Sequence, residues 1–212
     1  QRLLLEESWH GLEEAGMTAS TLAQGRTGVY VGVMSTDYHQ VLSDPRLAVE
    51  ASAGLGASGG ILANRLSHAL KLTGPSAAID AACASSLLAL DQARQALETG
   101  LCDYALVAGV SLNLDAWKYV SFSQAGMLSP TGRCHSFDLN ADGYVPGDGV
   151  VVALLCREAT ARATGRRPHA LVLGSAVNHC GGGKGITQPS VTSQAQVIQS
   201  ALAQAKLKAN EI

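Results

Sequence analysis

The middle of this 212-residue chain carries the run Asp80-Ala81-Ala82-Cys83-Ala84-Ser85-Ser86-Leu87. The apolar residues just before this run predict a short strand. The apolar spacing from Ala84 to about Glu98 predicts a helix that stops at Gly100. Cys83 is therefore expected on a sharp turn from a strand into a helix. The small residues on both sides permit such a turn and leave the sulfur accessible.

The setting of Cys83 suits a nucleophile, because only the thiolate form attacks and the start of a helix favours negative charge. N–H groups in the first turn of a helix can also donate to an oxyanion. This is the logic of the serine nucleophile elbow, with sulfur in its place. On spacing alone, an inert core cysteine is an equally good interpretation. The other cysteines lack this setting and are predicted to be packing or loop residues: Cys102, Cys134, Cys156 and Cys180.

Strands and helices are predicted to alternate around this turn, in the order of a layered α/β fold. The predicted strands are 27–34, 77–79, 104–112, near 150–156 and 169–176. The predicted helices are 1–16, 61–70, 84–98, a short one between the last two strands, and 190–206. A polar loop is predicted at Asp37, Tyr38, His39 and Asp44-Pro45. The strand–helix–strand unit around Cys83 predicts a parallel pair of strands, and no domain boundary is predicted inside the chain.

Composition and charge argue against several classes of function. The chain is 47% hydrophobic and 15% charged, with a formal net charge of −2. A sizeable core is therefore expected, and a basic surface for nucleic acid or an anionic membrane is not. No apolar stretch is long enough to span a bilayer. The five cysteines are odd in number and form no Cys-x-x-Cys pair, which argues against a disulfide framework or zinc site and for a reducing, cytoplasmic compartment.

Two other patterns could suggest sites, and both are better interpreted as loops. The glycine-rich residues 181–185 lack the Gly-Lys-Ser/Thr ending of a phosphate-binding loop. Asp138 and Asp142 could suggest a metal or acid/base pair, but aspartates that stabilise turns are the more common explanation. No metal site is predicted.

Further motifs extend along the chain and support one family. They are Arg2-Leu3-Leu4-Leu5-Glu6, Thr27-Gly28-Val29-Tyr30-Val31-Gly32, Asn64-Arg65-Leu66-Ser67, Leu128-Ser129-Pro130-Thr131-Gly132-Arg133-Cys134, Ala141-Asp142-Gly143-Tyr144 and Gly174-Ser175-Ala176-Val177-Asn178-His179. Together with the Cys83 run, they resemble the β-ketoacyl synthase (ketosynthase) domain of type I modular polyketide synthases, in the thiolase superfamily.

The resemblance implies an α/β, thiolase-like layered fold, of which this chain holds mainly the N-terminal half, incomplete at both ends. It implies that Cys83 accepts an acyl chain from the phosphopantetheine thioester of an acyl carrier protein. A malonyl-type extender then loses carbon dioxide and condenses with that acyl group. The expected partners are the carrier protein, a second copy in a homodimer and other domains of a multidomain synthase. The chain itself is expected to bind no cofactor.

The resemblance also assigns three weaker site residues. Gly109 and Val110 match the wall of the family's acyl pocket, and Phe122 matches a position that reaches the pocket of the other protomer. Ordinary core packing is at least as good an interpretation for each of these three residues.

The family uses two histidines besides the cysteine, the first in a His-Gly-Thr-Gly-Thr run that does not occur here. Residues 1–212 are therefore expected to be a partial ketosynthase domain that lacks the first strand and the C-terminal half, and to be inactive in condensation alone. A non-elongating ketosynthase that only binds or transfers acyl chains is an alternative. A fatty-acid synthase ketosynthase is another, although the Ser-Pro-Thr-Gly-Arg and Ala-Asp-Gly-Tyr motifs favour polyketide synthesis. A cysteine hydrolase of unrelated fold is the last.

Overall fold

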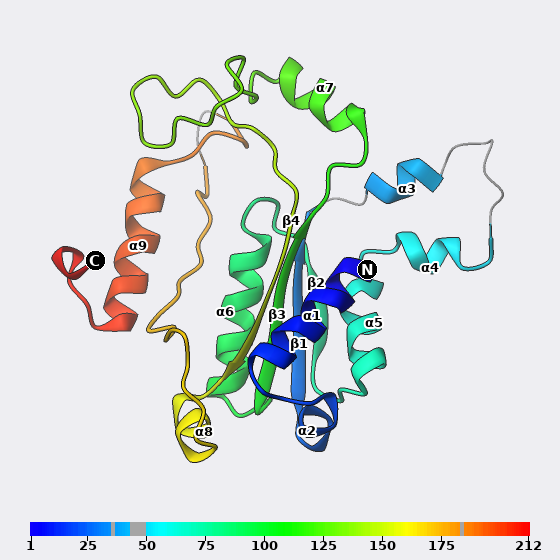
Figure 1. Cartoon of the computed structure of the whole chain (residues 1–212). Coiled ribbons are helices and arrows are strands. Elements are labelled where there is room, and N and C mark those ends of the chain that lie inside the picture. The colour runs from blue at the N-terminus through cyan, green and yellow to red at the C-terminus, as the bar shows by residue number, and fades with distance from the viewer. Residues whose placement is uncertain (35–36, 43–49, 183–184) are drawn as a thin grey trace. The chain divides into compact units, whose positions relative to one another are not determined.

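The computed structural model describes residues 1–34, 37–42, 50–182 and 185–212. Its contacts divide the chain into two compact units, Gln1–Leu155 and Cys156–Ile212. Figure 1 shows the course of the chain with its elements labelled.

The first unit is built on a four-stranded sheet. The strands are β1 (Thr27–Val33), β2 (Ser76–Ile79), β3 (Tyr104–Ser111) and β4 (Gly149–Cys156), and their order in the sheet is β2-β1-β3-β4. Strand β1 pairs in parallel with both β2 and β3, so β2 and β3 run in the same direction. The predicted pairing of these two strands is wrong, because β1 lies between them.

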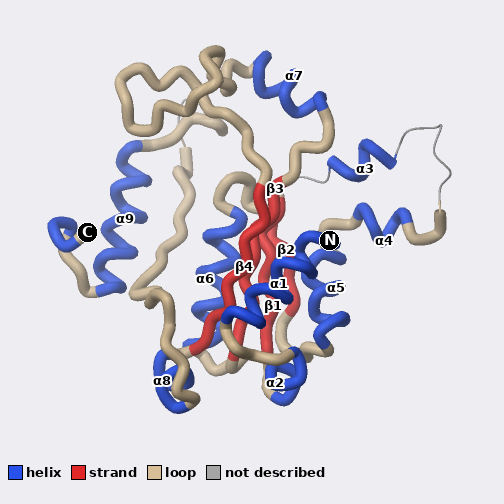
Figure 2. Tube along the Cα trace, in the orientation of Figure 1, coloured by secondary structure: helices blue, strands red, loops and turns tan. Residues whose placement is uncertain are grey.

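Helices cover both faces of the sheet, as the red strands and blue helices of Figure 2 show. On one face lie α1 (Arg2–Glu14), α2 (Ala19–Gln24) and α5 (Ile61–Leu70), and on the other lies α6 (Ser85–Glu98). The strands alternate between the two cores, as side chains on a strand must. Val29 and Val31 belong to the first core, whereas Tyr30 between them belongs to the second. A three-layer α/β arrangement results, as the sequence predicts.

The two cores differ in side-chain size. The core under α1, α2 and α5 contains leucines from all three helices, among them Leu4, Leu22 and Leu66. The core under α6 contains mainly small residues from that helix, with Ala89, Ala93 and Ala96 facing the sheet. Small side chains let a helix pack closer to a sheet, so α6 and the turn before it are held near the strands.

Three shorter helices complete the first unit: α3 (Asp37–Leu42), α4 (Ala53–Ala57) and α7 (Ala116–Gln124). The prediction of a polar loop at Asp37, Tyr38 and His39 is wrong, because these residues form the first turn of α3. Asp37 places its negative charge at the helix start, where it stabilises the helix. Asp44-Pro45, the rest of that predicted loop, lies outside the described residues.

The second unit contains α8 (Glu158–Ala163), α9 (Val191–Ala205) and the short 3-10 helix η1 (Ala209–Glu211). The strand predicted over 169–176 is wrong, because these residues have no regular secondary structure. A strand needs a partner along its edge, but this segment meets a helix instead. A Cβ on Gly174 would lie 2.7 Å from the carbonyl oxygen of Ala201 in α9. The Ser175 N–H donates to the side-chain oxygen of Gln204 in the same helix, at 2.7 Å.

The helices give no sign of a membrane span. Within the described part of the chain, every helix is too short or too polar to cross a bilayer. All five cysteines are free thiols.

Candidate active site

Cys83 lies on the turn that connects β2 to α6, between Ile79 and Ser85. The predicted position on a sharp strand-to-helix turn is therefore confirmed. The thiol is exposed to solvent, whereas Cys102 is completely buried. The interpretation as an inert core cysteine therefore fits Cys102 and does not fit Cys83.

The backbone of this turn adopts an uncommon conformation one residue before the cysteine. Ala82 has φ of +51°, in the left-handed region that residues with a Cβ rarely occupy. Such a conformation persists where the surrounding structure over-determines it, and it occurs often at active sites. Here the Asp80 carboxylate accepts from the Ala82 N–H at 3.0 Å, and the Ser85 hydroxyl donates to the Ala82 carbonyl at 2.6 Å. Side chains on both sides of Cys83 thus hold the turn.

Two glycines of the sheet allow the start of α6 to lie directly on the strands. Gly32 of β1 and Gly109 of β3 are register partners. A Cβ on Gly32 would lie 2.5 Å from the Cα and N atoms of Ser86, and a Cβ on Gly109 would lie 3.0 Å from the Ser86 Cβ. Because any side chain at Gly32 would displace the first turn of α6, this glycine sets the height of Cys83 above the sheet. An isolated glycine in a buried strand is the sequence signal for such a close approach.

The three weaker site residues, Gly109, Val110 and Phe122, lie in three different environments. Gly109 lies beside Ser86, in the first turn of α6, and so belongs to the surroundings of Cys83. Val110 is half-buried and packs against the leucine-rich core on the opposite face. Phe122 lies on α7 and does not belong to either core.

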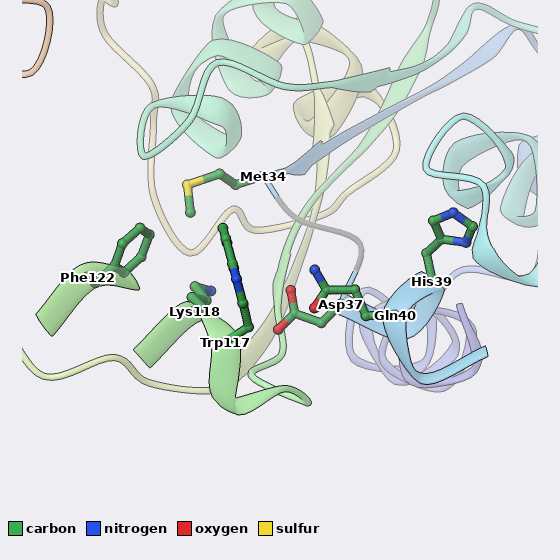
Figure 3. Close-up of a pocket in the computed structure, with 7 residues that line it drawn as sticks. All are labelled: Met34, Asp37, His39, Gln40, Trp117, Lys118 and Phe122. Carbon is green, nitrogen blue, oxygen red and sulfur yellow. The ribbon is translucent and has the colours of Figure 1, made fainter. Parts of the chain in front are cut away.

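Phe122 lines a pocket between the end of β1 and helices α3 and α7. The pocket has a volume of about 250 Å³ and is lined by Met34, Asp37, His39, Gln40, Trp117, Lys118 and Phe122. Figure 3 shows the rings of Phe122 and Trp117 rising from α7 toward Met34.

Tyr144 pairs with Phe122, although it is not among the predicted site residues. Its ring centroid lies 6.3 Å from that of Phe122, in a tilted aromatic pair. Burial raises the pKa of the Tyr144 phenol, with a smaller contribution from the charge of Cys83. Backbone hydrogen bonds to Met127 and Ser129 hold Tyr144 in place. No local sequence pattern marks the aromatic pair, because Phe122 and Tyr144 come from separate segments of the chain.

The two aspartates that could suggest a metal site act within the loop that carries Tyr144. Asp138 accepts from the Asn140 N–H at 2.8 Å, and Asp142 accepts from the Thr131 hydroxyl at 3.1 Å. The hydrogen bond from the Ser129 hydroxyl, with smaller contributions from Thr131 and His135, holds the pKa of Asp142 below its usual value. Within the ranges that the structure describes, no cluster of three His, Cys, Asp or Glu side chains could hold a metal ion.

Comparison with known protein families identifies the family of this chain. Residues 1–161 match the N-terminal domain of β-ketoacyl synthases, and residues 169–212 match the C-terminal domain of β-ketoacyl synthases. The chain belongs to the β-ketoacyl synthase family. The first of these matches contains the whole Cys83 turn, the two glycines, Phe122 and Tyr144.

Among known relatives, this ketosynthase chain is similar to polyketide synthases. It is 42% identical over its full length to a component of the phenolphthiocerol/phthiocerol polyketide synthase of Mycobacterium tuberculosis, and it spans 11% of that protein. It is 40% identical over 95% of its length to the polyketide synthase PksN of Bacillus subtilis, of which it spans 4%. The chain thus corresponds to a small part of these relatives.

Solved structures show the same fold. An oxazolomycin ketosynthase domain of Streptomyces albus superposes with a TM-score of 0.89 at 38% identity, covering 98% of this chain and 37% of that one. A ketosynthase of the bacillaene synthase of Bacillus subtilis superposes with a TM-score of 0.88 at 39% identity, covering 97% of this chain and 35% of that one. The expected thiolase-like α/β fold of the ketosynthases is confirmed.

Proposed function

We propose that this chain is the cysteine-bearing part of a polyketide synthase ketosynthase, and that Cys83 is its acylated nucleophile. The observation that carries the proposal is the exposed Cys83 thiol on a sharp strand-to-helix turn in a chain of the β-ketoacyl synthase family. The resemblance to polyketide synthases over 95% or more of this chain supports polyketide over fatty-acid synthesis.

The first step is transfer of an acyl group to Cys83. The thiolate attacks the carbonyl carbon of a phosphopantetheine thioester carried by an acyl carrier protein, and a tetrahedral oxyanion forms. Backbone N–H groups at the turn, including that of Cys83, donate to the oxyanion. The intermediate then expels the pantetheine thiolate, which takes up a proton, and leaves an acyl-cysteine thioester. Covalent catalysis of this kind divides a difficult reaction into two easier ones.

The second step is condensation. A malonyl-type extender on a carrier protein loses carbon dioxide, and the resulting enolate attacks the acyl-cysteine carbonyl and releases the Cys83 thiolate. In this proposal the histidines that assist this step come from outside residues 1–212. The acyl carrier protein, a second copy of the chain and the other domains of a synthase are the proposed partners, with the cytoplasm as the proposed compartment.

The acyl group is proposed to lie beside residues that already surround Cys83. Gly109 lies next to the first turn of α6. Tyr144, whose phenol pKa the charge of Cys83 helps to raise, pairs with Phe122. Val110 packs into the opposite core, so a contact of its side chain with the acyl chain has less support.

Mass spectrometry on the full-length protein that carries this chain tests the proposal. The protein is incubated with acetyl, butyryl and hexanoyl pantetheine thioesters, and the peptide that contains Cys83 is analysed for an acyl addition. We expect the addition on wild type, its loss in Cys83→Ala and its retention in Cys180→Ala, which removes another exposed thiol. A folded wild type that gains no acyl group from any thioester, or an addition that survives Cys83→Ala, would overturn the proposal.

A non-elongating ketosynthase remains the second candidate, and the same sample separates the two. A protein that is acylated on Cys83 but forms no extended product with a malonyl carrier protein only transfers acyl chains. A protein that forms the product with release of carbon dioxide is a condensing enzyme.

A further inference from the structure

Ser85 makes two hydrogen bonds that join the strand side of the Cys83 turn to its helix side. Its hydroxyl accepts from the Ala81 N–H at 2.9 Å and donates to the Ala82 carbonyl at 2.6 Å. The residue is only 4% exposed, so water does not replace these partners. Cys83 lies between the residues that this hydroxyl connects.

Both backbone groups of Ala82 are occupied by this arrangement. Its N–H donates to the Asp80 carboxylate at 3.0 Å, and its carbonyl accepts from the Ser85 hydroxyl and from the Ser85 N–H at 3.1 Å. Ala82 is the residue with φ of +51°. A residue with a Cβ leaves the left-handed region unless its surroundings prevent it. The hydrogen bonds of Asp80 and Ser85 are the contacts that prevent it here.

The rest of the surroundings fix the helix side of the turn. Ser86 rests on Gly32 and Gly109 with no space for a Cβ at Gly32, so the start of α6 cannot shift toward the sheet. The direction of the Cys83 side chain then depends on the conformation of Ala82 relative to this fixed point. The Ser85 hydroxyl donates one of the hydrogen bonds that hold that conformation.

We propose that Ser85 is a positioning residue, whose buried hydroxyl locks Ala82 in its left-handed conformation and so aims the Cys83 thiol at the incoming thioester. The proposal rests on the proposed acylation of Cys83 and adds a residue that determines its rate. Ser85 does not touch the acyl group. Its role is to hold the turn in the geometry that the attack requires.

The first test is the kinetics of Cys83 acylation by butyryl pantetheine in the full-length protein. A misplacement of about 1 Å can lower a rate by roughly 100-fold, so Ser85→Ala is expected to lower the maximal acylation rate by roughly 10- to 100-fold. The half-saturating thioester concentration should stay within about twofold, because the thioester does not contact Ser85. Ser85→Thr keeps the hydroxyl and should restore most of the rate. Ser20→Ala removes an exposed hydroxyl on α2, on the other face of the sheet, and should leave the rate unchanged.

A double variant separates positioning from stability. Glycine adopts positive φ without strain but is not confined to it. Ala82→Gly in the Ser85→Ala background should therefore recover thermal stability and leave residue 82 free to change conformation. If Ser85 acts only through stability, the acylation rate recovers with it. If Ser85 positions the thiol, the rate stays low, whereas Ala82→Gly alone, which keeps the hydroxyl, retains most of the wild-type rate.

Alkylation of Cys83 by iodoacetamide distinguishes failure of this inference from failure of the proposed function. The rate constant at the Cys83 peptide should fall in Ser85→Ala and recover in Ser85→Thr, whether or not the protein accepts a thioester. If a folded Ser85→Ala variant is acylated and alkylated at the wild-type rates, the inference is overturned and the acyltransferase function stands. Altered alkylation without any acylation of wild type would overturn the function and leave the positioning role standing.

Discussion

The two faces of the sheet are packed with side chains of different size. On one face, α1, α2 and α5 contribute leucines such as Leu22 and Leu66. On the other face, α6 contributes alanines, and its first turn lies against Gly32 of β1. Large apolar side chains supply most of the free energy of burial, whereas small side chains let a helix lie close to the sheet. The leucine face thus serves mainly for stability, and the alanine–glycine face serves to place the turn that carries Cys83.

Gly32→Ala is the strongest test of this difference. The added Cβ would lie 2.5 Å from the Ser86 backbone, so the start of α6 must move. We expect a loss of about 3 kcal/mol or more in the free energy of unfolding, and a roughly 100-fold slower acylation of Cys83 in the protein that remains folded. Chemical denaturation and acylation kinetics measure the two effects.

Gly11→Ala on the leucine face is the matched control for Gly32→Ala. Gly11 lies in α1, and a Cβ there meets only Val152 at 3.8 Å, an ordinary contact. Alanine should stabilise this helix by about 0.5–1 kcal/mol and leave acylation unchanged. Equal behaviour of the two variants would contradict the proposed difference between the faces.

Leu66→Ala should produce the opposite pattern. This side chain is 1% exposed in the leucine-rich core, and its truncation should cost about 2–5 kcal/mol of stability. The turn before Cys83 is packed on the other face, so the acylation rate per folded molecule should stay within about twofold below the melting transition. A large loss of rate in a sample that circular dichroism shows to be folded would mean that the two faces are coupled.

Tyr30 gives a smaller test on the α6 face, through pH. Burial, and next the charge of Cys102, raise the pKa of this phenol in the folded state. The folded state therefore keeps the proton at pH values where the unfolded state has lost it. Stability from this residue is complete below the unfolded pKa of about 10 and declines as the pH rises through the folded pKa. Tyr30→Phe should flatten the decline of the melting temperature above about pH 10; an unchanged slope would show that Tyr30 does not cause it.

Local patterns predicted most of the elements near the site. Apolar spacing placed helices α1, α5, α6 and α9 and strands β1 to β4 within a few residues. The patterns fail where polar or apolar composition alone does not decide the secondary structure. The apolar residues 169–176 do not form a strand, since they lie beside α9 instead of another strand. Helix α7 was missed, although Asp115 caps it by accepting from the Trp117 N–H, which is a readable signal.

The family, the layered α/β class and the place of Cys83 on a strand-to-helix turn all follow from the amino-acid sequence alone. Motifs and periodicities that a few adjacent residues carry are enough to predict them. The three-dimensional fold was needed to establish that β1 separates β2 from β3, that Ser85 and Asp80 hold Ala82 at positive φ, and that Tyr144 pairs with Phe122. Strand order and the aromatic pair both join separate segments of the chain. The conformation of Ala82 depends on the close approach of α6 to the sheet. A local pattern of apolar residues cannot predict such tertiary contacts.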